Sequence, residues 1–513
     1  MSRWPYDAEE TRVSESVWQY VIIGAGSAGA VLAGRLSEDP DVAVLLLEAG
    51  PDFRTDDTPP QFHSRDVDMS LDANPGMWWP KLLSRRNPAQ DPYLYLRGRG
   101  AGGSSTVNGL CAIRGVPDDY DGWAAAGATG WAYADVLPAF RRSEDDHDFG
   151  DADYHGRGGP TPVYREPRDG WGGVDDAFTE AASALGAPYQ PDHNAPGATG
   201  LSPFAMNIRD GRRVSTNDGY LEPARDRPNL EIRGDVHEDT LVLAADRTTV
   251  RGERLAGGET ILVGSGGEVI VACGAAHSPA LLMRSGIGPA ADLAALGIEP
   301  AADLPVGRHL QDHAMLMVPV PAAEQTRQSR DSRVTNIVWR SSSGLGGAGV
   351  NDMMLLPNNG AHTGHAWLIA QQEQVFSRGT LTLASADPLA DPVIEQNLLV
   401  DERDQIRMAD AVDRMAALLG EPSFAGIVTG DVDLPKPHDL PNIIGDTVHL
   451  CATCPMGPED GPHTVVDPDG KVLGLDGVRV IDASIIPAIP RANLHLTVVM
   501  IAEHLAARLR AGA

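Results

Sequence analysis

The chain has 513 residues with 42% hydrophobic and 22% charged side chains, which suits a globular protein of about two or three domains and argues against disorder, collagen and coiled coil. Its 41 Lys and Arg against 71 Asp and Glu give a formal net charge of −30, which argues against binding to nucleic acid or anionic lipid and leaves a solvated acidic surface or a cationic partner. The 4 cysteines are too few for a disulfide scaffold.

Residues 1–18 are predicted to form an extension ahead of the first domain, because they are polar and charged. They lack the basic start and apolar core of a secretory signal. The longest apolar candidate for a membrane helix, 494–502, is far shorter than the ~18 residues needed. We therefore expect a cytoplasmic protein without a membrane span.

A strand, a glycine-rich turn, a helix and a second strand come next. Residues 19–23 form a β-branched run, and 24–29 have the pattern Gly-x-Gly-x-x-Gly. Residues 30–37 have the apolar face of a helix, and 42–47 form another apolar run that ends at Glu48. This order is typical of a dinucleotide-binding unit and does not choose between NAD and FAD.

Each residue of this signature has a physical role in that interpretation. Gly24 permits the tight turn, Gly26 lets the backbone approach a pyrophosphate, and Gly29 lets the helix pack closely on the strand. The helix N-terminus favours the phosphate charge. Glu48 is expected to accept hydrogen bonds from the adenosine ribose hydroxyls.

A second glycine-rich stretch covers residues 97–109. Its small residues suit a backbone that lies flat against a planar ligand. A flexible linker is the other interpretation, but it does not explain why Asn108 and Arg114 flank an apolar continuation at 110–113.

The remaining strand signals are spread along the chain. Residues 142–175 are acidic and rich in Gly and Pro, as expected where a chain crosses between domains. A strand at 269–273 precedes a helix with Pro279 near its N-terminus, and a strand at 478–482 precedes a final helix from about Thr497. The nucleotide-binding domain is therefore predicted to be discontinuous, with a second domain inserted between its pieces.

Six segments in order resemble the glucose–methanol–choline (GMC) family of FAD-dependent oxidoreductases. They are the N-terminal fingerprint and the segments 98–108, 278–288, 304–313, 377–383 and the tail from 448. Within that family the chain resembles bacterial choline dehydrogenases and hydroxymethylfurfural oxidases, and its tail at 449–457 also resembles mycofactocin-associated members.

The resemblance implies an α/β protein (α+β overall), with a discontinuous Rossmann-like FAD-binding domain and an inserted antiparallel-sheet substrate-binding domain. The FAD-binding domain would comprise residues 19–150, 216–314 and 448–513, and the substrate-binding domain 151–215 and 315–447. FAD is expected to be non-covalent, because Val107 stands where some members carry an attaching His. The expected cofactor contacts are Gly24, Gly26, Ser27, Ala28, Gly29, Glu48, Ala49, Arg97, Gly102, Gly103, Ser104, Asn108, Gly109, Leu110, Cys111, Ala112, Glu238, Ala272, Ser278, Asp482, Ala483, Asn493, Leu494 and Thr497.

The resemblance also brings His449 and Asn493 together beside the flavin. A neutral imidazole, with an ordinary pKa of ~6.5, can take the proton of an alcohol hydroxyl near neutral pH. Asn493 would orient the same oxygen, and the N-terminus of the last helix near Thr497 would stabilise negative charge on the flavin. In the other interpretations His449 is structural, Asn493 is a helix cap, or His495 takes the role of Asn493.

Cys451 and Cys454 form a Cys-x-x-Cys pair. A redox pair and a zinc site are both possible uses of this spacing. Cys111 and Cys273 are solitary, however, and a site that included His449 would consume the proposed base. We therefore interpret the pair as small packing residues and expect no metal.

The predicted activity is oxidation of a primary or secondary alcohol, with oxygen, a quinone or another carrier as electron acceptor. Trp78, Trp79 and Trp367 are the bulky candidates for the substrate pocket. The alternatives are a lyase that keeps FAD and acts on a cyanohydrin, an NAD-dependent dehydrogenase, and a non-catalytic flavoprotein. The sequence leaves the alcohol, the acceptor and the oligomeric state open.

Overall fold

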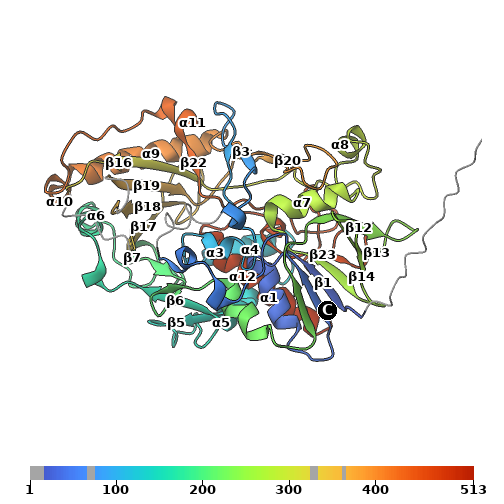
Figure 1. Ribbon diagram of the computed structural model, residues 1–513. Helices are drawn as coiled ribbons and strands as arrows, with labels where there is room; N and C mark the ends of the chain where they lie inside the picture. The colour runs from blue at the N-terminus through green and yellow to red at the C-terminus, as the bar shows by residue number, and fades with distance from the viewer. Residues whose placement is uncertain (1–16, 66–74, 324–332, 361–364, 513) are drawn as a thin grey trace, which may run out of the picture.

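The computed structural model describes residues 17–65, 75–323, 333–360 and 365–512 (Figure 1). Most of the predicted extension at 1–18 therefore lies outside the described residues. Two larger sheets dominate the fold (Figure 1). The six-stranded sheet lies at the left beneath α9, and the parallel strands lie at the right.

The first sheet is parallel and has five strands in the order β11-β2-β1-β15-β23. Ile22 in β1 is in register with Leu46 on one side and with Ile270 on the other. The three inner strands β2, β1 and β15 are short and mostly apolar and buried, as parallel strands covered on both faces require, whereas the edge strand β11 is partly exposed. The five strands are β1 (Tyr20–Ile23), β2 (Val44–Leu47), β11 (Leu230–Arg233), β15 (Glu268–Val271) and β23 (Val478–Val480). The predicted discontinuous Rossmann-like sheet is confirmed.

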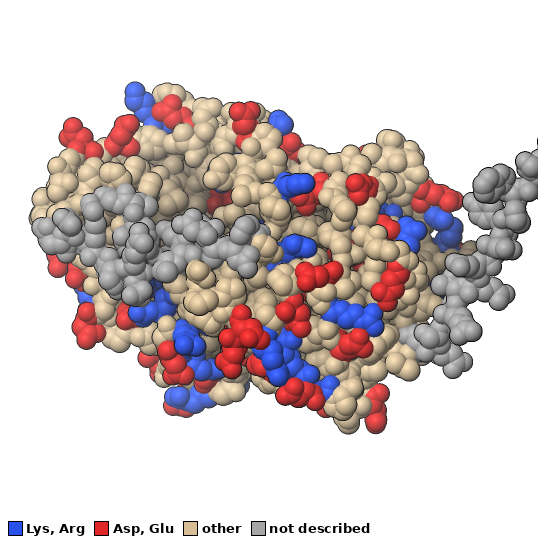
Figure 2. All heavy atoms as spheres, viewed as in Figure 1, with Lys and Arg blue, Asp and Glu red and all other residues tan. Residues whose placement is uncertain are grey.

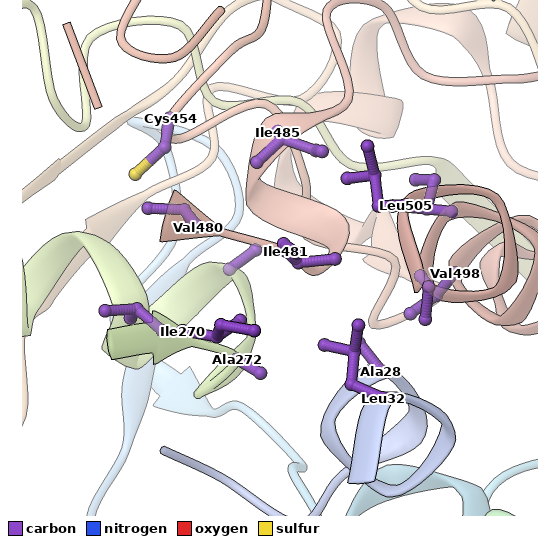
Figure 3. Packing of buried hydrophobic residues seen from close by; sticks show 14 of the residues in the cluster. Ala28, Leu32, Ile270, Ala272, Cys454, Val480, Ile481, Ile485, Val498 and Leu505 are labelled. Carbon is purple, nitrogen blue, oxygen red and sulfur yellow. The ribbon is translucent and has the colours of Figure 1, made fainter. Parts of the chain in front are cut away.

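Two helices from opposite ends of the chain pack together beside this sheet. They are α1 (Ser27–Leu36) and α12 (Leu494–Arg510). Figure 3 shows Ala28 and Leu32 of α1 facing Val498 of α12 within the shared apolar core. Both helices begin three residues earlier than predicted.

The helix α7 (Gly274–Arg284) corrects the prediction for Pro279. Pro279 lies inside the helix rather than near its start, so its missing N–H leaves the carbonyl of Ala275 without a helical partner. The hydroxyl of Thr453 donates to that carbonyl at 2.8 Å. Thr453, which lies between the two tail cysteines, therefore supplies the hydrogen bond that Pro279 cannot make.

Further elements complete the nucleotide-binding side of the molecule. An antiparallel sheet packs through its middle strand against β15, and it consists of β12 (Glu238–Leu243), β13 (Val250–Leu255) and β14 (Thr260–Leu262). The helices on this side are α3 (Ser104–Val107), α4 (Pro117–Ala125), α5 (Tyr133–Ser143) and α8 (Ala290–Ala295). A π-helical turn at Asn217–Leu221 packs on α1.

The second large sheet is antiparallel and has six strands in the order β22-β16-β19-β18-β17-β7. Alternate residues of its strands separate into two cores, as the period of a strand requires. Leu355 packs with the covering helices, while Met354 and Leu356 belong to a smaller core on the opposite face. The strands are β7 (Gly200–Pro203), β16 (Ala314–Val320), β17 (Ile337–Ser341), β18 (Met353–Asn358), β19 (Ala366–Gln372) and β22 (Gly445–Asp446). The helices near them are α6 (Gly173–Ala184), α9 (Glu402–Gly420), α10 (Pro422–Ala425) and α11 (Leu440–Ile443).

Smaller sheets join segments that the sequence assigned to different domains. Val163, Leu381 and Ile394 pack into the core of the nucleotide-binding side, although the predicted bounds placed them in the insert. One sheet has the order β20-β21-β3-β4, and the other β5-β6-β8. Their strands are β3 (Leu83–Arg85), β4 (Tyr93–Leu94), β20 (Thr380–Thr382), β21 (Val393–Glu395), β5 (Glu144–Asp146), β6 (Thr161–Arg165) and β8 (Ala205–Met206). A two-stranded hairpin pairs β9 (Ile208–Arg209) with β10 (Arg212–Arg213).

Charges of both signs are interspersed over the lower part of the face in Figure 2. Ion pairs such as Arg225 with Asp52 and Arg35 with Glu503 join basic and acidic groups far apart in sequence. Among the described residues, no helix has the length and apolar character needed to cross a bilayer.

Candidate active site

A cavity of about 670 Å³ lies between the two large sheets. That volume is in the range of ligand-binding sites in proteins. From the nucleotide-binding side its wall includes Gly26 and Glu48, and from the six-stranded sheet it includes Met354. His449 and Asn493 line the same cavity, so the structure brings the predicted cofactor contacts and the predicted catalytic pair into one space.

Most of the predicted cofactor contacts line this cavity. They are Gly24, Gly26, Ser27, Ala28, Glu48, Ala49, Arg97, Gly103, Ser104, Asn108, Gly109, Cys111, Glu238, Ala272, Asp482, Ala483, Asn493 and Leu494. The predicted contacts that do not line it are Gly29, Gly102, Leu110, Ala112, Ser278 and Thr497.

The residues outside the wall hold the lining in place. Ser278 donates to Asp482, which also accepts the N–H of Gly274 at 2.8 Å. The Thr497 hydroxyl lies 3.2 Å from that of Tyr120, in the buried interior. Leu110 belongs to the core rather than to the wall. These side chains therefore act on a ligand only through their neighbours.

The three glycines of the first turn meet different surroundings. Gly24 has a φ of +98°, and a Cβ on it would lie 2.6 Å from the carbonyl oxygen of Ala272. A Cβ on Gly29 would lie 1.8 Å from the carbonyl oxygen of Gly24, so α1 can approach the turn only because this residue is glycine. A Cβ on Gly26 would meet no atom closer than 4.0 Å and would occupy the open space ahead of the helix. A phosphate could approach the backbone there.

Glu48 ties three backbone segments together. One carboxylate oxygen accepts the N–H of Ala25 at 2.8 Å, and the other accepts those of Gly50 at 2.9 Å and Gly100 at 2.8 Å. Burial raises the pKa of this carboxyl, while the three N–H groups oppose that shift. A carboxylate has about four acceptor positions, so one stays available for a ribose hydroxyl.

His449 and Asn493 form the polar centre of the cavity. The Asn493 Nδ2 lies 3.4 Å from the His449 Nε2. Asn493 occupies the N-cap position of α12, but its side chain makes no capping hydrogen bond. Its Oδ1 is buried and has no hydrogen-bond partner among the described residues. The side chain is thus directed to the site rather than to the helix end.

The other nitrogen of His449 is held from behind. Its Nδ1 lies 2.6 Å from the Thr447 hydroxyl oxygen and 3.0 Å from the His313 Nδ1. Because the Thr447 hydroxyl can itself donate to the carbonyl of His313, we assign the His449 proton to Nδ1 and the lone pair to Nε2. Burial, with smaller effects of His313 and Arg97, holds the pKa of His449 well below 6.5. The imidazole is therefore neutral at neutral pH.

Two buried groups fix the backbone around His449. The His449 N–H donates to Asp312 at 2.8 Å, and the Leu450 N–H donates to the Tyr95 hydroxyl at 3.0 Å. The Tyr95 hydroxyl in turn donates to Asp312 at 2.6 Å. Burial and the nearby Asp446 raise the pKa of Asp312 to about 7. The backbone next to His449 thus depends on side chains distant in sequence.

Sequence reasoning did not assign roles to these supporting residues. Asp312 and His313 close the segment 304–313, and Thr447 stands two residues before His449, so proximity to recognised motifs was an available signal. Tyr95 likewise stands two residues before Arg97, but only the fold brings β4 and its flank to the tail.

The predictions for His495 and for the tryptophans have different outcomes. His495 lines the cavity with its Nδ1 3.4 Å from the Ser27 hydroxyl, whereas Asn493 is the residue that approaches His449. Trp78 and Trp79 line the cavity. Trp367 does not line the cavity, so its prediction as a pocket residue was wrong. It packs against the small core that contains Met354 and Leu356.

The cysteines of the tail are buried thiols. All four cysteines of the chain are free. Burial raises the pKa values of Cys451 and Cys454 well above 9.0, which disfavours the reactive thiolate. Figure 3 shows Cys454 beside Val480 in the core. This environment is that of packing side chains.

A separate cluster of ionisable groups joins Glu144, Asp146 and His155. Arg114 pairs with Glu144 at 2.5 Å, and Arg165 pairs with Asp146 at 3.0 Å. Two arginines thus already compensate these buried carboxylates. The cluster anchors the acidic segment at 142–175 to the nucleotide-binding side.

A Rossmann-like sheet, a helix N-terminus opened by Gly26 and a neutral histidine facing the same cavity define a dinucleotide-dependent oxidoreductase. Two family models described as GMC oxidoreductase match residues 18–315 and 375–502. The chain belongs to the GMC oxidoreductase family, whose members oxidise CH–OH donors with FAD.

Individual relatives agree with this assignment. The chain is 36% identical to the 5-(hydroxymethyl)furfural oxidase of Methylovorus sp. (strain MP688), over 96% of this chain and 99% of the relative. It is also 36% identical to the oxygen-dependent choline dehydrogenase of Burkholderia thailandensis, over 96% and 94% respectively. Among solved structures, pyridoxine 4-oxidase from Mesorbium loti has a TM-score of 0.87 at 29% identity and covers 96% of this chain and 99% of its own.

The residues present fit FAD. The space next to Gly26 suits a phosphate, the Glu48 carboxylate reaches the cavity wall, and small residues of the second glycine-rich stretch line it. A Cβ on Gly274 would likewise meet no atom within 4 Å and would project into the open. At these glycine positions, a side chain would occupy the space that is open to FAD.

Proposed function

We propose that this protein oxidises a primary or secondary alcohol to the aldehyde or ketone, with His449 as the base and Asn493 as the group that orients the hydroxyl. The main support for this proposal is that the Asn493 Nδ2 lies 3.4 Å from the His449 Nε2 at the wall of the cofactor cavity. The named activities of the relatives support an alcohol donor.

The residues divide the work as follows. FAD, when bound, supplies the hydride acceptor and so carries the redox step. The neutral His449 accepts the hydroxyl proton on Nε2. Its Nδ1 keeps its own proton and donates it in a hydrogen bond to the Thr447 hydroxyl. The unpartnered Asn493 Oδ1 and the neighbouring N–H groups of the amide hold the substrate oxygen in place. The N-terminus of α12 adds a positive electrostatic potential beside the site.

Non-covalent attachment of FAD is part of the proposal. Val107 is 4% exposed and lines the cavity with a hydrocarbon side chain, which offers no nucleophile for a bond to the flavin. Precipitation of the yellow protein with acid should leave the flavin in the supernatant. Flavin that stays with the pellet contradicts this part of the proposal.

The activity is tested by anaerobic mixing with a panel of alcohols, sugars and polyols. We expect the oxidised flavin absorption to bleach with at least one donor. A lyase on the same scaffold would leave the flavin oxidised. His449→Ala should keep bound FAD but lose on the order of 100-fold or more in the rate of bleaching, because a positioned base contributes about that much. Unchanged bleaching in this variant means that another group is the base.

The finer assignments rest on the same experiment. Recovery of the oxidised spectrum on admission of air identifies oxygen as an acceptor, and persistence of the bleached state favours a quinone or another carrier. Hydroxymethyl-aryl alcohols and choline are the first donors to compare, because relatives at 36% identity carry those activities in their names. The mycofactocin association is not part of the proposal, since none of the reported relatives supports it.

A further inference from the structure

The part of the cavity wall built by residues 333–371 combines apolar side chains with a few polar ones. Met354, Leu356 and Ile369 line it and belong to the small core that also contains Phe204 and Ala492. Ala492 precedes Asn493, so this small core reaches the backbone next to the proposed catalytic pair. Among the described residues of 333–371 that line the cavity, one carries a charge, and it is Arg333.

Arg333 is a buried cation with no ion pair to a carboxylate in the part of the chain that the structure describes. It is 6% exposed, and its guanidinium carbon lies 5.2 Å from the centre of the Phe204 ring. Its Nη1 has one long hydrogen bond, at 3.5 Å, to the carbonyl of Arg65, and its Nε is buried with no hydrogen-bond partner among the described residues. It forms no ion pair with any described carboxylate. A guanidinium held in this way is costly unless a ligand compensates it.

The carboxylates that line the cavity contrast with Arg333, because each already has a partner. Asp446 is paired with Arg86 at 2.5 Å, and Glu238 lies 3.7 Å from Arg284. Glu48 accepts three backbone N–H groups, and Asp482 accepts donors from Gly274, Ser278 and Ser484. Among the described residues, the cavity thus offers a positive group without an ion pair and no carboxylate without a partner, despite the net charge of −30.

We propose that the substrate is an alcohol that also carries a carboxylate, and that Arg333 binds this carboxylate. The apolar side chains of the wall would hold an aryl or alkyl body between the two polar ends, with the hydroxyl at His449 and Asn493. This inference rests on the proposed function. The O–H and C–H bonds of the carbinol break and a C=O bond forms, as in any alcohol oxidation, while the carboxylate is unchanged. An Arg–carboxylate pair can form two parallel hydrogen bonds, which an amide in its place cannot match.

The kinetic test compares matched acids and amides on the FAD-containing enzyme. The donors are para-(hydroxymethyl)benzoate with its amide and an ω-hydroxyhexanoate with its amide. Wild type should prefer the acid of a pair by at least about tenfold in kcat/KM, and Arg333→Gln should lower that value for the acid by on the order of 100-fold, mainly through KM. Arg333→Lys should recover part of the loss. Arg251→Gln, an exposed arginine on β13, is the matched control and should change neither donor.

A binding measurement keeps the proposal testable without turnover. Benzoate added to the oxidised holoenzyme should perturb the flavin absorption at lower concentration than benzamide, and the difference should vanish in Arg333→Gln. If that variant does not fold, the wild-type comparison of benzoate with benzamide decides alone. Equal affinity for both ligands, or equal kcat/KM for acid and amide, overturns the inference while leaving alcohol oxidation intact. Failure of every alcohol to bleach the flavin overturns the proposed function, whereas selective benzoate binding would still support the anion site.

Discussion

His449 is buried beside a cavity rather than exposed at its rim, and this location sets the pH dependence of catalysis. Burial holds the pKa of His449 well below 6.5, so the proposed base is neutral throughout the neutral range. We expect kcat/KM for an alcohol to be constant from pH 6.5 upward through neutrality and to fall only on further acidification. Steady-state kinetics over this range checks the expectation. A midpoint at or above pH 6.5 would show that the titrating base is another group.

Replacing Asn493 by aspartate, which has nearly the same shape, tests the geometry around His449. Asn493→Asp places a carboxylate about 3.4 Å from the His449 Nε2. A negative charge at that distance favours the imidazolium, so the pKa of His449 should rise by about 1–3 units. The pH below which kcat/KM falls should rise by a similar amount. Asn493→Ser, which adds no charge, should lower the rate without changing this pH.

At the scale of the element, the first turn separates packing from ligand contact. Gly26→Ala leaves the fold intact, because the added Cβ meets no atom closer than 4.0 Å, but it occupies the space assigned to the cofactor phosphate. Gly29→Ala brings a Cβ to 1.8 Å from a carbonyl oxygen and should disrupt the turn itself. We expect soluble, colourless Gly26→Ala protein and little soluble Gly29→Ala protein. Full flavin content in Gly26→Ala would contradict the phosphate position.

The helix α7 depends on a side chain from the tail. Thr453→Val removes the hydroxyl that satisfies the Ala275 carbonyl and leaves that buried group unpaired. The cost should be about 1–3 kcal/mol, seen as a lower midpoint of thermal unfolding. Thr453→Ser keeps the hydroxyl and should unfold close to wild type. Equal midpoints for the Val and Ser variants would mean that the carbonyl finds another partner.

Across the whole molecule, buried carboxyls couple stability to pH. Burial raises the pKa of Glu373 to about 7 from 4.5, so its protonated form is the one that the fold favours. The stability that it contributes is fully present below pH 4.5 and is lost as the pH rises through about 7.

Glu373→Gln mimics the protonated acid and removes this loss. The free energy of unfolding of the variant should match that of wild type below pH 4.5 and exceed it by about 3 kcal/mol above pH 7. Unfolding at a series of pH values measures the difference. Glu459→Gln, at an exposed glutamate, is the control and should show no such pH-dependent gain. A constant difference across the series would contradict the titration of Glu373.

The sequence predicted the elements that local patterns define. The β-branched run at β1, the glycine turn and the acidic end of β2 fix a Rossmann-like unit, and short chain motifs placed His449 and Asn493 in one site. The start of α12 was misplaced because local pattern alone could not show that Asn493 ends the preceding loop. Pro279 was misplaced because its compensation comes from Thr453, a contact that no local pattern encodes.

Long-range contacts account for the rest of what the sequence could not show. The Tyr95–Asp312 pair and the contact of Arg333 with the Phe204 ring arise from packing between distant segments. The predicted domain bounds, the roles of the site residues and the cytoplasmic location stay predictions.

The late position of β23 and α12 in the chain has a consequence during synthesis. A nascent polypeptide that has emerged only as far as Gly470 already contains the other strands of both large sheets, yet it lacks the covering partner of α1 and the amide of Asn493. We therefore expect stable coenzyme binding only after nearly the whole chain has been synthesised. Premature termination there would leave the apolar face of α1 bare and give a substrate for proteolysis rather than a partly active enzyme.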